Sequence, residues 1–208
     1  LYMLIVALAT LVSNGMSSIL ARNLGAANMD AARATFTGAH GLALILGAIL
    51  IALFLLFGQP MALLVAGGSE DLAAMGIIYL RITIFFSPLL FVLSVNSDAL
   101  RNEGRVGFMA AMSLLVSVAN IAFNYLLIAI FEMGVAGSAY GTAAAQVLAL
   151  LIIFGFRLRG ETSLRPVHLL RFSLANHWGR ILALGAPQSF NCLGVDFFFS
   201  WFFSSRYR

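Results

Sequence analysis

The chain is divided into six apolar runs, each close to the length of a membrane crossing, and this limits what it can fold into. A helix needs ~20 residues to cross a hydrocarbon core of about 30 Å. The runs cover residues 1–20, 36–57, 77–98, 108–131, 138–156 and 181–203. A crossing segment must satisfy its own backbone hydrogen bonds, and no run shows the two-residue alternation of a barrel strand. Each run is therefore predicted to be a helix.

The composition also indicates that lipid is the solvent. The 208 residues are 62% hydrophobic and only 10% charged, whereas a soluble domain has about 25% charged residues. The net charge of +4 does not indicate a nucleic-acid partner, because all twelve basic residues are Arg and most lie between the apolar runs. We predict an all-α, polytopic membrane helical bundle whose partner is the lipid bilayer.

The Arg residues predict the orientation of this bundle. Nine of the twelve fall in alternate gaps, which are residues 21–35, 99–107 and 157–180. The other gaps hold acidic residues and no Arg, and only Arg81 is near that side. The positive-inside rule makes the Arg-rich side cytoplasmic. Because the sequence starts inside an apolar run and stops abruptly at SSRYR, we also expect a fragment that lacks an earlier crossing.

Polar residues recur along one face of the fourth run. Ser113, Ser117, Asn120 and Asn124 are spaced by four, three and four residues, which places them in one stripe on a helix. Comparable faces occur in other runs, and their members are Thr10, Asn14 and Ser17; Ser87, Ser94 and Asp98; Thr142 and Gln146; and Ser189, Asp196 and Ser200. Interhelical hydrogen bonds, worth about 0.6 kcal/mol each, explain any single one of these residues. Their presence in five of the six runs favours a cavity that water or a solute can enter.

Asp196 is the sharpest single candidate, because it lies about sixteen residues into its run. A charge at the centre of a membrane helix costs on the order of 2.5–3.5 kcal/mol. We favour a proton- or cation-binding role, with a shorter helix that brings Asp196 to headgroup water as the alternative. By contrast, Asp98 and Arg101 are spaced for a salt bridge at a helix end, and His40 is expected to make an interhelical hydrogen bond.

Enzyme chemistry is not supported by the sequence. There is no Gly-rich phosphate loop and no nucleophile spaced with a base, and one Cys with three scattered His cannot form a metal-ligand cluster. We expect no catalytic residue and no bound cofactor.

Three stretches, in order along the chain, resemble the multidrug and toxic compound extrusion (MATE) transporters. The first is SSILARNLGAANMDAARAT (Ser17–Thr35), and the second is YLRI (Tyr79–Ile82) leading through Pro88 to ALRNEGRVGFMAAM. The third is NIAFNYLLI followed by MGVAGSAYGTAAAQ, and a GAP motif (Gly185–Pro187) comes after it. The resemblance implies efflux of small organic cationic compounds, driven by Na⁺ or H⁺ through alternating access. It also implies a multi-pass protein of the bacterial inner (plasma) membrane that works as a monomer when full length.

The resemblance also implies a domain organisation. The six runs would be helices two to seven of twelve. Residues 1–158 would form the amino-terminal lobe without its first helix, and residues 181–208 the truncated start of the second lobe. Residues 159–180 would be a cytoplasmic linker with an amphipathic helix in the interface, anchored by Trp178. A solvated loop is the alternative for that linker.

The family comparison suggests which residues couple transport to a cation. One branch has an Asn and an Asp one turn apart on helix five, and a Thr on helix six. Asn120 and Thr142 match, but Asn124 stands where that branch has Asp. A neutral Asn cannot titrate, although Asn120, Asn124 and Thr142 could give oxygen ligands to Na⁺. Another branch has an acid on helix seven about eight residues after the motif's proline, and Asp196 is nine residues after Pro187.

Two other functions stay open. A flippase for lipid-linked oligosaccharides, from the same superfamily, is expected to have more basic residues in its cavity than the single Arg81 near an edge here. The chain could also be an inactive, truncated membrane fragment, since one lobe cannot form a cavity that alternates between two lobes.

Overall fold

A computed structural model describes residues 2–65, 70–160, 162–164, 177–187, 189–190 and 194, and these are helical apart from short turns. The elements are α1 (Tyr2–Gly25), α2 (Met29–Val65), α3 (Glu70–Phe85), α4 (Ser87–Asn102), α5 (Val106–Tyr125), a π-helical turn η1 (Leu126–Ile130) and α6 (Gly134–Leu158). Residues 178–187 form a further helical segment. The predicted all-α fold is confirmed.

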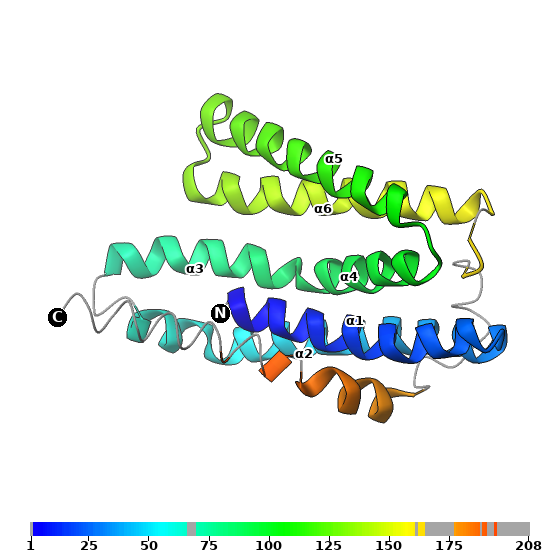
Figure 1. The fold of residues 1–208 in the computed structure, drawn as a ribbon. Coiled ribbons are helices and arrows are strands. Elements are labelled where there is room, and N and C mark those ends of the chain that lie inside the picture. Colours follow the sequence, from blue (N-terminus) through cyan, green and yellow to red (C-terminus); the bar gives the residue numbers. More distant parts are fainter. Residues whose placement is uncertain are drawn as a thin grey trace.

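The helices lie roughly side by side in a bundle (Figure 1). α4 lies centrally, in contact with α1 and α2 on one side and with α5 and α6 on the other. The larger apolar core is shared by α1, α2 and α4 around Phe36 and Phe91. A smaller core joins the amino-terminal half of α5 to α6 through Met109, Met112 and Ile153. α5 and α6 therefore form a pair that is fastened to the rest of the bundle through α3 and α4.

Among the described residues, four helices are long and apolar enough to cross a membrane, and α3 with α4 makes up to a fifth span, bent by 47°. The bend is explained by Pro88, which has no N–H to donate and follows the break at Phe86. The Ser87 hydroxyl donates to the Ile84 carbonyl at 2.7 Å. This carbonyl oxygen would otherwise lack a donor, because Pro88 has no N–H. The expected sixth run begins in the helical segment 178–187 and continues outside the described residues.

The described helix ends place Arg residues at one end of the bundle, where α1 meets α2, α4 meets α5 and α6 ends (Figure 1). The turn between α4 and α5 needs Gly104, whose φ of +79° suits glycine. Many large apolar side chains stay exposed, including Leu55 at 71% and Leu114 at 69%. Lipid is the solvent that such a surface suits.

Candidate functional site

The polar stripe on α5 meets α6 in a hydrogen-bonded chain of three side chains, which we call the polar relay. The Asn124 amide donates to Asn120 Oδ1 at 3.0 Å. The Asn120 amide donates in turn to Thr142 Oγ1 at 3.2 Å, and the Thr142 hydroxyl donates to the Ser138 carbonyl at 3.0 Å. The relay brings together three residues that the sequence singled out, across the two helices on which they were expected.

Small residues let the two helices approach this closely. A Cβ on Gly141 would collide with the Asn124 side chain and lie 3.0 Å from the Asn124 backbone nitrogen, and one on Gly137 would lie 3.1 Å from the Leu127 backbone. Small residues at membrane helix interfaces typically allow such a close approach. The approach leaves Asn124 Oδ1 buried, with no hydrogen-bond partner among the described residues.

The relay is neutral and rich in oxygen. A side-chain amide does not titrate, so the relay cannot take up or release a proton. Asn124 Oδ1 has both lone pairs available, and Asn120 Oδ1 and Thr142 Oγ1 can each accept one more contact. Amide and hydroxyl oxygens suit hard cations, so the donor set fits Na⁺ better than it fits a transition metal. Groups of three or more His, Cys, Asp or Glu able to hold a metal are absent from the part of the chain that the structure describes.

The other half of the polar stripe lines a separate cavity. Ser113 and Ser117 border a cavity of about 230 Å³ between α4, α5 and α6, together with Ser97 and Arg101. Arg101 also pairs with Asp98 at 3.5 Å, as expected from their spacing. The stripe is therefore split between this cavity, at the Arg-rich end, and the relay, nearer the opposite end.

Thr142 belongs to a second space as well. With Gln146 it borders a small cleft between α6 and the bent span, where Tyr79 and Thr83 face them. Its volume of about 20 Å³ suits roughly one water molecule. The relay thus connects to polar groups of the bent span.

The predicted site residue Asn14 is not joined to the relay. Asn14 lies half-buried on α1, and α1 contacts α2, α3 and α4 but not α5 within the described helices. The α1 polar face meets α4 instead, where the Asn102 amide donates to Ser17 Oγ at 2.7 Å. Asp196 lies outside the described residues, as do Cys192 and Ser200.

A buried polar network lies near the Arg-rich end, and the sequence did not predict it. Arg157 is 0% exposed and its guanidinium donates to Glu103 Oε2 at 3.1 Å, to the Leu164 carbonyl at 2.6 Å and to the Asn96 carbonyl at 3.3 Å. Glu103 Oε1 accepts from the Leu164 N–H at 2.7 Å. Burial raises the pKa of the Glu103 carboxyl, and the Arg157 guanidinium opposes that rise. This ion pair holds the start of the segment after α6 against the α4–α5 turn.

His40 lies beside this network and confirms the expected interhelical hydrogen bond. Its Nε2 is 2.9 Å from the Asn96 amide nitrogen, and its Nδ1 is 2.9 Å from the Phe36 carbonyl oxygen. Trp178 also bonds to protein, since its indole N–H donates to the Gly38 carbonyl at 3.0 Å. Trp178 thus contacts α2.

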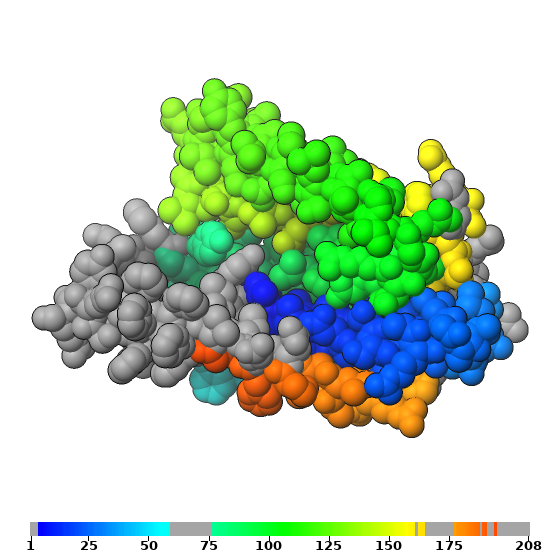
Figure 2. Space-filling model, in the orientation of Figure 1, coloured from blue at the N-terminus to red at the C-terminus, as the bar shows by residue number. Residues whose placement is uncertain are grey.

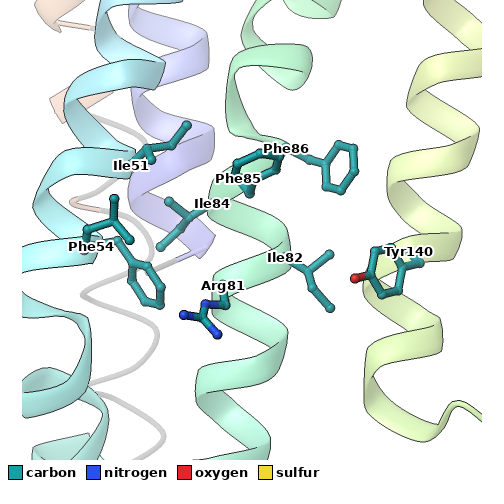
Figure 3. A pocket seen from close by; sticks show the side chains of 9 residues that line it. Ile51, Phe54, Arg81, Ile82, Ile84, Phe85, Phe86 and Tyr140 are labelled. Carbon is teal, nitrogen blue, oxygen red and sulfur yellow. The ribbon is translucent and has the colours of Figure 1, made fainter.

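An apolar cavity of about 370 Å³ lies at the other end, between α2, α3 and α6, and we call it the outer pocket. Figure 3 shows Arg81 extending from α3 toward Phe54 of α2, and the Tyr140 hydroxyl pointing from α6 toward Ile82. Sequence reasoning had placed Arg81 only as a charge near an edge.

Comparison with known proteins identifies the fold. The MatE family profile matches residues 1–126. A multidrug resistance MATE family transporter of the MOP superfamily in an inward-facing conformation is 27% identical with a TM-score of 0.83, covering 92% of this chain and 44% of that one. A MOP superfamily transporter from Pyrococcus furiosus Vc1 is 27% identical with a TM-score of 0.84, covering 95% and 44%. No curated protein matches.

The chain thus spans less than half the length of these solved structures. The profile match covers more than half of the chain, and the bundle repeats the helical fold of a family whose members are transporters and not enzymes. The chain therefore belongs to the MatE family of membrane transporters, as the sequence resemblance implied.

Proposed function

We propose that the full-length protein is a secondary active efflux transporter, which exchanges organic cationic compounds for Na⁺ or H⁺ by alternating access. The single observation that carries this proposal is the polar relay with its unpartnered Asn124 oxygen. A buried acceptor left without a donor costs about 1–3 kcal/mol, and a bound cation or water removes that cost.

The chemistry of the relay supports a mechanism in which the cation ligands and the coupling charge come from different residues. Asn120, Asn124 and Thr142 supply neutral oxygen ligands on the first lobe, while Asp196 supplies the charge that couples transport. A cation held by neutral oxygens alone binds weakly and leaves readily, which suits a transport pathway.

The shape of the bundle is also consistent with transport. Figure 2 shows a hollow between α5 and α1, with α3 and α4 at its floor. The 230 Å³ cavity beside Ser113 and Ser117 also gives Ser97 and Arg101 of the bent span access to open space.

The test is extrusion of ethidium by the full-length protein in a host that lacks its own efflux pumps. Cells with the wild type should accumulate less dye than cells with an empty vector, and Asp196→Asn should remove most of that difference. Equal dye in wild-type and vector cells, with the protein present in the membrane, would overturn the efflux function. Full activity of Asp196→Asn would overturn only its coupling role.

A further inference from the structure

The position of Arg81 in its span places its backbone within the apolar core of the bilayer. It belongs to the bent span Gly76–Asn102, and it lies eight residues from the midpoint of that range. At the helical rise this is about 12 Å from the middle of a core whose half-thickness is about 15 Å. A cation at that depth requires an anionic partner or a path to water.

The described protein offers Arg81 no carboxylate. The ion pairs found in the described part of the chain join Arg33 to Asp30, Arg101 to Asp98 and Arg157 to Glu103. The acidic positions on its own helix, Glu70 and Asp71, lie about 15 Å away along the axis. Arg81 is exposed and lines the outer pocket, and no carboxylate of the described residues pairs with it.

The remaining lining of the outer pocket suits an apolar chain. Ile51 and Phe54 come from α2, Ile82 and Phe85 from α3, and Tyr140 contributes an aromatic ring with one hydroxyl (Figure 3). The volume of about 370 Å³ is in the range of small-molecule sites. A greasy cavity with a guanidinium and a phenol selects a ligand with an apolar body and an anionic head.

The bilayer is the source that the geometry favours. Two residues of the pocket, Leu55 and Phe85, are 71% and 67% exposed and are apolar, so the pocket opens on an apolar surface of the described helices. We propose that the outer pocket binds one anionic phospholipid. Its phosphate pairs with the Arg81 guanidinium, which matches phosphate oxygens in a two-pronged geometry, and one acyl chain lies in the cavity between α2 and α6.

The experiment is native mass spectrometry of the purified full-length protein in detergent, titrated with phosphatidylglycerol and, separately, with phosphatidylcholine of the same acyl chains. The wild type should retain phosphatidylglycerol in preference. Arg81→Gln should lower that retention about tenfold, the size expected for a lost charge-assisted hydrogen bond, and Arg81→Lys should lower it less. Arg22→Gln, the matched loss of an exposed Arg at the opposite end, should leave it unchanged.

A second variant tests the cavity without touching the charge. Leu55→Trp fills the apolar part of the pocket from an exposed position and should also reduce retention of phosphatidylglycerol. Thermal unfolding of each variant in the same detergent controls for misfolding. Equal retention of both lipids by the wild type overturns the proposal, as does equal retention of phosphatidylglycerol by wild type and Arg81→Gln. An equal loss in Arg22→Gln would also overturn it, because binding would then follow total charge.

Discussion

At the residue scale, the polar relay can supply oxygen ligands to a cation but cannot exchange a proton. Asn124 occupies the position where a carboxylate would titrate, and its amide is held by Asn120 on one side and packed against Gly141 on the other. Its oxygen is left free to accept a ligand. An amide in this position gives the site one charge state at every pH.

Asn124→Asp should therefore add a pH-dependent step to efflux. In acid the new carboxyl is protonated and neutral, like the amide, and transport should approach the wild-type rate. As pH rises through the pKa of that carboxyl, the site gains a negative charge and the rate should depart from the wild type. Ethidium efflux measured across a pH series checks this, and parallel profiles for the two proteins would leave the relay with a packing role only.

The buried Arg157–Glu103 pair should be costly to break from either side. Removing one partner of a buried pair typically costs about 3–5 kcal/mol, because the other charge stays buried. We expect such losses for Arg157→Met and for Glu103→Leu, and a double variant that loses less than their sum. Unfolding in mixed micelles measures all three, and strict additivity would show that the pair is not coupled.

The same pair predicts a pH dependence. Burial already raises the pKa of Glu103, and Arg157→Met removes the charge that opposes this. The folded variant then binds a proton that the unfolded chain releases, so its stability is highest in acid and falls as pH rises through the raised pKa. Arg157→Met should thus be less destabilising in acid than at neutral pH.

At the element scale, the sequence predicted the positions of the helices better than the contacts between them. Run lengths predicted six spans, and up to five of them are found among the described helices, one of them bent near Pro88. Helical spacing correctly placed Ser113 to Asn124 on one face, but it could not show that the face divides between a cavity and α6. The π-helical turn after Tyr125 left no signal in the apolar run.

Gly141 and Gly155 give α6 a matched pair for testing helix approach. Gly141→Ala places a Cβ against Asn124 of α5, where overpacking costs about 1–3 kcal/mol. Gly155→Ala meets nothing within 4 Å and should be neutral or stabilising by up to about 1 kcal/mol. Unfolding in mixed micelles should separate the two, and equal effects would contradict the close contact at Gly141.

At the scale of the whole molecule, long-range pairings are what sequence reasoning missed. Glu103 and Arg157 are 54 residues apart, and each had an adequate local explanation, as part of a basic turn and as a topology charge. Periodicity relates residues within one helix and carries no information on contacts between helices. The charge asymmetry, in contrast, is a property of the whole chain, and it agrees with the helix ends seen in Figure 1.

That asymmetry predicts the orientation in the cell. In a Cys192→Ser background, Ala26→Cys labels the turn between α1 and α2, and Met133→Cys labels the turn between η1 and α6. A membrane-impermeant maleimide should modify Met133→Cys in intact cells and Ala26→Cys only after permeabilisation. The reverse pattern would invert the assigned topology.

The Arg157–Glu103 pair has an evolutionary consequence. Two segments distant in sequence converge on it, since Glu103 accepts from the Leu164 N–H while Arg157 donates to the Leu164 carbonyl and to that of Asn96. A substitution at one charged position leaves the other buried without its partner, which makes each single change costly. Positions 103 and 157 are therefore expected to change together, with both charges kept or both replaced.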